Sequence, residues 1–177
     1  MATSLFKPRS VFLSLDVLSQ FHVQTPPIKE VTHRKDDTSM SIEENKANVR
    51  RGFEAVNQKN LAVFDELLTP DIVVHTASTT FQGLEAYKQF LSLSITAFPD
   101  LHFTVEDMIA EGDTVVVRYT TRGTHQGNFR GIPPTGKQVS GTGMFIDRLV
   151  NGKAVEQWFN SDDLGLLQQL GVIPPMG

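Results

Sequence analysis

The hydrophobic pattern of the chain changes its period near Pro99, and this change limits the folds open to it. Before Pro99, apolar residues recur every three or four positions, as on one face of a helix. After Pro99, they alternate with polar residues in runs bounded by turn residues, as in strands with one buried face. Helices followed by strands predict an α+β domain, in which a cone-shaped curved antiparallel sheet wraps around N-terminal helices. The open mouth of such a cone forms a pocket.

Individual elements follow from this pattern. A capping box of Ser41 and Glu44 predicts the start of the first helix. Asn151-Gly152 predicts a tight hairpin between two strands. We expect helices over residues 42–59, 61–68, 84–94 and 164–170. We expect strands over residues 72–75, 101–105, 114–125, 137–149 and 154–161.

Residues 1–39 show no sustained period, and Pro26-Pro27 with the polar run 32–39 is typical of a linker. We therefore expect residues 1–39 to be a flexible N-terminal extension and residues 40–177 to form the α+β cone domain. Lys7 and Arg9 among scattered serines give weak organelle transit-peptide character. We expect a cytoplasmic protein, with an organelle address as the alternative.

Composition argues against several classes of function. The chain of 177 residues contains no cysteine, which removes disulfides and thiolate chemistry. A net charge of −4 without a clustered basic excess argues against a nucleic-acid partner. No apolar run approaches the roughly 18 residues of a membrane helix, so we expect no membrane partner. The five histidines show no metal-binding helical spacing, and we expect no metal.

The sequence does not support two common catalytic motifs, a phosphate-binding loop and the nucleophile elbow of serine hydrolases. Residues 131–137 fit most of a phosphate-binding loop, but Gln138 replaces the Ser or Thr that holds magnesium. Pro133 and Pro134 also remove N–H groups that would cradle phosphates. The chain has no G-x-S-x-G elbow for a serine hydrolase. We interpret residues 131–137 as a stiff loop at one end of the sheet.

The end of the last strand carries a carboxylate with two interpretations. Alternation places Asp162 on the same face as Glu156, Trp158 and Asn160. In an apolar mouth, desolvation would raise the pKa of Asp162 and make it a general base. Alternatively, Asp162 or Asp163 caps the closing helix. Both interpretations stay open from the residues alone.

A series of short motifs occurs in a fixed order from residue 69 to residue 171. The motifs are Thr69-Pro70-Asp71-Ile72-Val73-Val74-His75, Gly83-Leu84-Glu85-Ala86, Ala97-Phe98-Pro99-Asp100, Ala110-Glu111-Gly112-Asp113, Gly123-Thr124-His125-Gln126-Gly127, residues 131–137, Asn151-Gly152-Lys153, Glu156-Gln157-Trp158 and residues 165–171. In this order and spacing the chain resembles the SnoaL-like polyketide cyclases, also called ester cyclases. The resemblance covers about residues 42–175.

This resemblance implies the cone fold of the nuclear transport factor two and ketosteroid isomerase superfamily, usually as a homodimer through the sheet. It also implies closure of the last ring of an aromatic polyketide methyl ester by an intramolecular aldol condensation, without metal or organic cofactor. Asp162 matches the acid/base aspartate of the family. The family supports this aspartate with a histidine, and here Arg148 stands at that place, which leaves His125 or His75 as replacements.

The expected ligand is a small hydrophobic carbonyl or ester compound. Candidate catalytic residues are Asp162, His125 and His75. Candidate substrate-binding residues are the possible enolate partners and the aromatic residues that would line a pocket: Arg118, Tyr119, Phe129, Phe145, Arg148 and Trp158. Two alternatives stay open: a different lyase, isomerase or hydrolase using the same pocket, and a non-catalytic module that binds a small molecule or a protein.

Removal of residues 1–39 is expected to leave the melting temperature of the domain nearly unchanged, because this segment shows no core pattern. Thermal denaturation of the full chain and of residues 40–177, followed by circular dichroism, measures the effect. A drop of several degrees would show instead that the segment packs on the domain.

Overall fold

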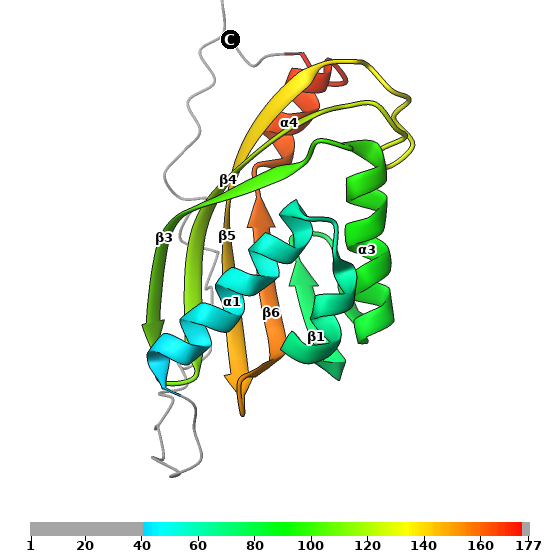
Figure 1. The fold of residues 1–177 in the computed structure, drawn as a ribbon. Helices are drawn as coiled ribbons and strands as arrows, with labels where there is room; N and C mark the ends of the chain where they lie inside the picture. Colours follow the sequence, from blue (N-terminus) through cyan, green and yellow to red (C-terminus); the bar gives the residue numbers. More distant parts are fainter. Residues whose placement is uncertain (1–40, 175–177) are drawn as a thin grey trace, which may run out of the picture. The chain divides into compact units, whose positions relative to one another are not determined.

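The computed structural model describes residues 41–174, and the extension expected at residues 1–39 lies outside this range. The described part is a mixed α+β domain with a curved, unclosed six-stranded sheet, which confirms the expected fold class (Figure 1). Its helices are α1 (Ile42–Asn57), η2 (Leu61–Val63), α2 (Phe64–Leu67), α3 (Leu84–Ala97) and α4 (Asp163–Leu170). Its strands are β1 (Leu68–Thr76), β2 (Thr80–Gln82), β3 (His102–Glu111), β4 (Thr114–Thr124), β5 (Gln138–Val150) and β6 (Lys153–Ser161).

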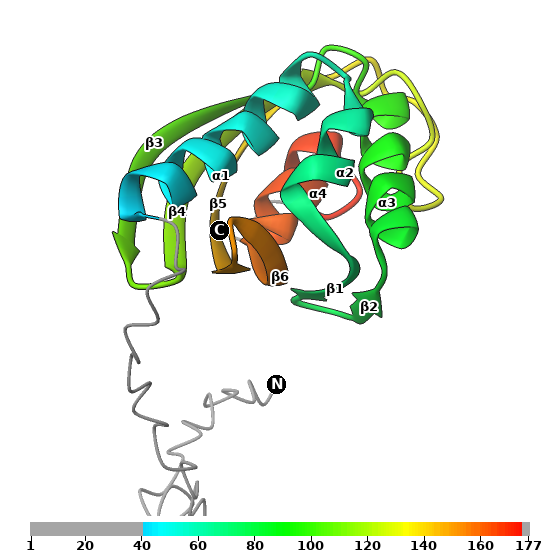
Figure 2. The same cartoon turned by 60° about the horizontal axis from the view of Figure 1, so that its bottom comes forward.

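Helix α1 begins at the capping box that the sequence predicts. The Ser41 hydroxyl accepts a hydrogen bond from the Glu44 N–H at 3.2 Å, and the Glu44 carboxylate accepts one from the Ser41 N–H at 2.8 Å. One face of α1 is buried through Val49, Ala55 and Val56. This face lies on the concave side of the sheet, where α1 crosses the strands (Figure 2).

The sheet has the order β2-β1-β6-β5-β4-β3. Its neighbours are antiparallel except for β1 and β6, which pair in parallel. The sequence analysis expected antiparallel pairing throughout, and this pair is the exception. Hydrophobic alternation does not report strand direction, because parallel and antiparallel strands both alternate their side chains.

Strand β1 is longer than expected, and β2 was not expected. The helix expected over residues 61–68 ends at Leu67, and Pro70 lies within β1. Proline has no N–H to donate, but the pairing of β1 with β6 is interrupted between Leu68 and Val73, so no ladder bond is lost there. With only three residues, β2 is too short for a periodic signal.

The hairpin between β5 and β6 determines which side chains face inward. Asn151 and Gly152 both have positive φ, at 50° and 76°, as a type I′ turn requires. A bulge then shifts the register between Arg148 and Leu149. As a result Asp147 lies opposite Gln157, and Arg148 lies opposite Glu156.

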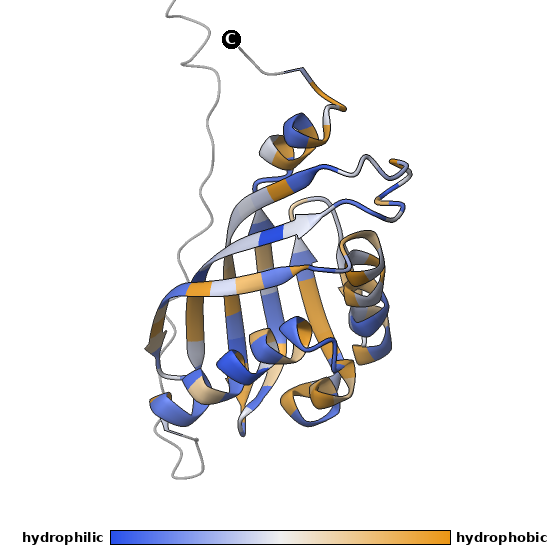
Figure 3. Ribbon diagram, turned by 45° about the horizontal axis from the view of Figure 1, so that its top comes forward, coloured by the Kyte–Doolittle hydropathy of each residue, from blue (hydrophilic) through white to orange (hydrophobic). Residues whose placement is uncertain are grey.

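The core fills the space between the concave side of the sheet and the helices. Its most deeply buried members are Ile72, Val74, Val115 and Val117. Hydrophobic segments are prominent on α2, α3 and the central strands, whereas α1 is largely hydrophilic apart from its buried face (Figure 3). Within residues 41–174, no helix has both the length and the apolar character needed to cross a membrane.

Candidate functional site

A largely apolar cavity of about 170 Å³ lies between the inner face of the sheet and helices α1 and α3. Its walls come from five elements. They include Phe53 on α1, Phe90 on α3, Tyr119 on β4, Phe145 on β5 and Phe159 on β6. Polar groups gather at its two ends, with Ser161, Asp162 and Asp163 beside α4 and with Asp147 and Gln157 near the β5–β6 hairpin. The site is therefore an apolar chamber with few polar groups, which is the usual composition of a small-molecule site.

Asp162 lies at the α4 end of the cavity and caps that helix. Its Oδ1 accepts a hydrogen bond from the Gly165 N–H at 2.8 Å. In the described part of the chain, this is the only hydrogen bond to the Asp162 carboxylate. A Cβ at residue 165 would overlap this carboxylate, so glycine is required for the close approach. The two interpretations of Asp162 are thus compatible, because the cap holds the carboxylate at the cavity.

Arg130 and Asp163 form an ion pair beside Asp162. The Arg130 guanidinium lies 2.8 Å from Asp163 Oδ2 and 5.0 Å from the centre of the Phe129 ring. Burial alone would raise the pKa of Asp163, but hydrogen bonds from Arg130 and Ser161 outweigh it and lower the pKa below its ordinary value. Asp163 therefore stays ionised, and a guanidinium is fixed at the cavity mouth.

Tyr119 is the buried hydroxyl donor of the inner wall. Only 1% of Tyr119 is exposed, and burial raises the pKa of its hydroxyl above the ordinary value, so the group stays protonated. Gly143 faces it across β4 and β5, and a Cβ there would overlap the hydroxyl. The absence of a side chain at residue 143 thus leaves room for the tyrosine in the wall of the cavity.

Asp147 and Gln157 are buried polar residues that the sequence analysis did not select. They are 3% and 2% exposed and lie opposite each other on β5 and β6. Burial raises the pKa of Asp147 to about 8, and the neighbouring amide of Gln157 partly offsets this rise. Asp147 alternates with Phe145 and Leu149, whose side chains face inward. A carboxylate in this apolar row is the sequence pattern from which its burial could have been predicted.

Four of the predicted residues line the cavity: Tyr119, Phe129, Phe145 and Asp162. His125 does not belong to this lining. It is fully buried between the rings of Phe98 and Phe129, and its Nδ1 accepts a hydrogen bond from the Thr135 N–H at 3.3 Å. His125 thus joins the end of β4 to the loop 126–137 and does not face the cavity for which it was a candidate catalytic residue.

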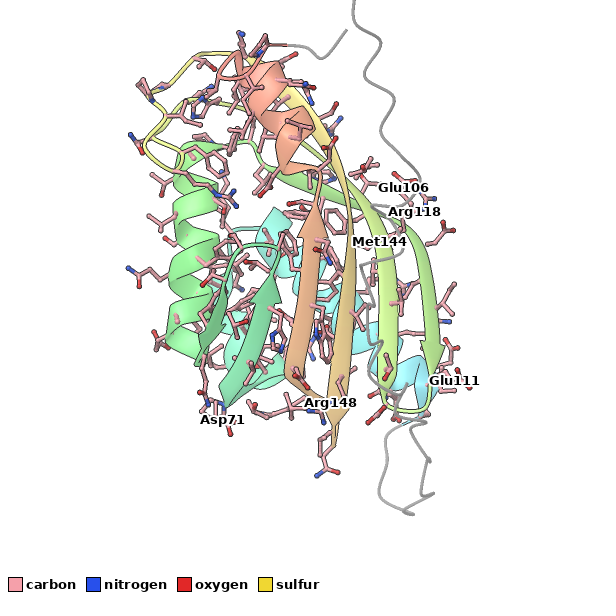
Figure 4. The ribbon with its side chains drawn as sticks, turned by 180° about the vertical axis from the view of Figure 1, so that it is seen from behind. Asp71, Glu106, Glu111, Arg118, Met144 and Arg148 are labelled. Carbon is pink, nitrogen blue, oxygen red and sulfur yellow. The ribbon has the colours of Figure 1, made fainter. Side chains whose placement is uncertain are left out.

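The other predicted residues do not line the cavity: His75, Arg118, Arg148 and Trp158. Figure 4 shows Arg118 and Arg148 on the outer face of the sheet. Arg118 pairs with Asp107 at 2.6 Å. Glu156 binds Arg148 at 2.8 Å and His75 at 2.9 Å, and both contacts hold the pKa of Glu156 below its ordinary value. Trp158 stacks on the His75 ring. Glu156 and Trp158 point away from the cavity because the bulge in the β5–β6 pairing turns Gln157 inward in their place.

Within residues 41–174, no three His, Asp or Glu side chains come close enough together to hold a metal ion. The polar groups of the cavity are instead two carboxyls at the mouth, one at the deep end, and neutral or cationic donors between them. This set can exchange protons with a bound organic molecule and donate hydrogen bonds to its oxygen atoms.

Residues 47–170 match the family description "SnoaL-like polyketide cyclase". The chain belongs to this family. The match confirms the resemblance inferred from the motifs and covers the whole cavity-forming part of the chain.

Relatives of this SnoaL-like protein include named cyclases. Aklanonic acid methyl ester cyclase DnrD of Streptomyces peucetius is 31% identical over 129 residues, covering 70% of this chain and 88% of the relative. AclR of Streptomyces galilaeus, a candidate hydroxylase, has a similar structure with a TM-score of 0.71 and 34% identity, covering 77% of this chain and 87% of its own. IdmH of Streptomyces antibioticus, a candidate polyketide cyclase, gives a TM-score of 0.64 and 33% identity, covering 72% and 98%.

Asp147 is expected to give the domain a pH-dependent stability. Its pKa rises from 3.8 to about 8 on folding, so between these values the folded state holds the extra proton. The free energy of unfolding should therefore fall as the pH rises through this window, by up to roughly 1.4 kcal/mol per pH unit. The neutral variant Asp147→Asn should lack this component, as measured by urea denaturation across the window.

Asp71→Asn, which removes an exposed carboxylate, serves as the control for this measurement. Its stability should follow that of the unmodified protein at every pH. Parallel pH profiles for Asp147→Asn and the unmodified protein would contradict the expectation.

Proposed function

We propose that the domain catalyses an intramolecular aldol cyclisation, or a closely related proton transfer, on a hydrophobic carbonyl or ester compound held in the cavity. The observation that carries this proposal is the position of Asp162, a carboxylate fixed at the mouth of an apolar chamber with hydrogen-bond donors in the same lining. The relative DnrD is named as a cyclase of a methyl ester, which agrees with this class of substrate.

Asp162 acts as the general base and then as the general acid. Its carboxylate takes a proton from a carbon that lies between two carbonyl groups, because these groups make the C–H bond acidic. The enolate carbon attacks a second carbonyl carbon of the same molecule, so one carbon–carbon bond forms and the electrons of the C=O π bond move to its oxygen. Asp162 returns the proton to that oxygen. All atoms of the substrate are retained, and no step requires a metal or an organic cofactor.

Tyr119 and Arg130 stabilise the negative charge that develops on oxygen. The Tyr119 hydroxyl is buried and protonated, and the Arg130 guanidinium is positioned by Asp163. Donors fixed before the reaction stabilise an enolate more than water does, because they need no reorganisation. Phe129 and Phe145 hold the ligand in a folded conformation in which the two reacting carbons meet. His75, Arg118, Arg148 and Trp158 have no role in this mechanism, since they lie outside the lining.

The alternative is a protein that binds a small molecule without turning it over. The cap formed by Asp162 favours this alternative, because capping of α4 by itself explains an aspartate at this position. The similar structure of AclR, a candidate hydroxylase, supports a further alternative, in which the same pocket serves a different reaction.

The proposed base is tested by deuterium exchange at the activated carbon of small β-keto esters in D₂O, followed by NMR. The unmodified protein should accelerate the exchange, and Asp162→Asn should lose most of it, on the order of 10²-fold or more. Asparagine is also a good helix cap, so the variant keeps α4 and removes only the base.

Asp71→Asn is the control, because it removes an exposed carboxylate that does not line the cavity. It should retain a large part of the exchange activity. No acceleration by the unmodified protein would favour the binding protein, and acceleration that survives in Asp162→Asn would exclude Asp162 as the base.

We also propose that the domain forms a homodimer through the outer face of the sheet. An apolar row crosses four strands there, since Ile109 pairs with Val116, Val116 with Ile146, and Ile146 with Trp158. Ile109 is 70% exposed in the single chain, and Met144, which projects from the same face (Figure 4), is 61% exposed. Charged pairs flank the row on both sides. An apolar strip within a polar rim is the usual pattern of a protein interface.

Ile146→Asp should place an unpaired charge in the middle of this row and convert the dimer to a monomer. Light scattering after size-exclusion chromatography measures the change. Leu93→Asp is the control, because Leu93 is an exposed apolar residue, at 64%, that lies on α3 and not on the sheet. A monomer for the unmodified protein, or an Ile146→Asp dimer, would contradict the proposed interface.

A further inference from the structure

Two oxygen atoms at the deep end of the cavity have no hydrogen-bond partner among residues 41–174. They are Oδ1 of Asp147 and Oε1 of Gln157, which lie on adjacent strands in directly opposed positions. Both residues are more than nine-tenths buried, and both line the cavity. Apart from the buried Tyr87 hydroxyl, which faces both residues, the surrounding wall is apolar and includes Leu149 and Ala154.

Such a pair is costly to the fold unless something binds there. A buried polar atom without a partner destabilises a protein by about 1–3 kcal/mol, and most buried polar groups are therefore paired. Hydrophobic residues of similar volume would pack at these two positions at lower cost. The combination of an acidic group and an amide in an otherwise apolar wall thus indicates recognition of a polar group on a ligand.

We infer that the deep end of the cavity recognises a hydroxyl group of the ligand, with Asp147 and Gln157 as its two hydrogen-bonding partners. This inference rests on the proposed function and narrows its substrate class. The ligand is a hydrophobic carbonyl or ester compound that also carries a hydroxyl at the end remote from the reacting carbons.

The chemistry of the two side chains favours a hydroxyl over other polar groups. In the described residues Asp147 has no cationic partner, and its raised pKa of about 8 leaves it a neutral acid near pH 7. A neutral carboxyl donates a hydrogen bond, whereas the amide oxygen of Gln157 accepts one. A hydroxyl both accepts and donates, so it satisfies the two groups together. A carbonyl or ether oxygen accepts only and would leave the Gln157 oxygen unpaired.

The distance between this end and Asp162 determines the length of the ligand. Gln157 and Asp162 are five positions apart along the chain, which corresponds to roughly 16 Å for an extended strand. The lining between them is aromatic, with Phe145 and Phe159. A ligand that reaches both ends is therefore elongated and apolar in its middle.

Three naphthalene derivatives of nearly equal shape test this recognition: naphthylmethanol, ethylnaphthalene and naphthylmethylamine. Their dissociation constants at neutral pH are measured by calorimetry with the full chain. The alcohol should bind at least tenfold more tightly than the ethyl compound, because a site built to bind a hydroxyl disfavours the analogue without it. Binding should also shift the side-chain amide signals of Gln157 in NMR spectra.

Asp147→Leu and Gln157→Leu should each remove the preference for the alcohol by on the order of tenfold while keeping the affinity for ethylnaphthalene. Leucine is similar in volume to both side chains and fits the apolar wall, so both variants are expected to fold. Thr121→Val is the matched control, since Thr121 lines the same cavity but is neither of the proposed partners. It should keep the preference.

Equal affinity for the alcohol and the ethyl compound would overturn the inference, as would failure of both to bind at millimolar concentration. A preference for the amine that disappears in Asp147→Leu would overturn it in favour of an ammonium site. These measurements need no turnover. If the protein does not accelerate deuterium exchange but prefers the alcohol, the proposed proton abstraction is wrong and hydroxyl recognition stands. If it accelerates the exchange but does not prefer the alcohol, hydroxyl recognition is wrong and proton abstraction stands.

Discussion

The position of Tyr119 in the cavity wall depends on the absence of a side chain at Gly143, which lies directly opposite it on β5. The Tyr119 hydroxyl lies where a Cβ of residue 143 would be, so any other residue there would displace the tyrosine or the strand. The cavity extends from α4 along the inner face of the sheet to Leu149 and Ala154, and α1, α2 and α3 all contribute to its lining. The buried polar pair of Asp147 and Gln157 lowers stability, whereas the apolar residues packed around the cavity stabilise the fold.

Most of the architecture could be predicted from local patterns in the sequence. The capping box at Ser41 and the Asn151-Gly152 turn occur where the residues indicate, because both depend on interactions within a few positions. The change of period near Pro99 gave the order of helices and strands for the same reason. Strand β2 and the parallel pairing of β1 with β6 depend on contacts between distant segments, and local patterns do not contain them.

The site was predicted less completely than the fold, largely because the β-bulge beside Leu149 changes which side chains of β6 face inward. Alternation shows which side chains of β6 share a face, but not which face is inner. Without the bulge beside Leu149, Glu156 would lie opposite Asp147, and Trp158 would follow it inward. With the bulge, Gln157 and Phe159 are inward instead. Asp162 still reaches the cavity, because it follows the end of β6 and its conformation is determined by the α4 cap.

The entrance to the cavity and the proposed base belong to different segments of the chain. The loop 126–137 is fastened at one end by His125 and at the other side of the mouth by the pair of Arg130 and Asp163. The Asp162 carboxylate is held independently by the backbone of Gly165. Insertions or deletions in this loop can therefore change the size of molecule that enters without altering the geometry of the acid/base group. The range of substrates can thereby change while the acid/base carboxylate stays in place, provided that Arg130 of the same loop is kept.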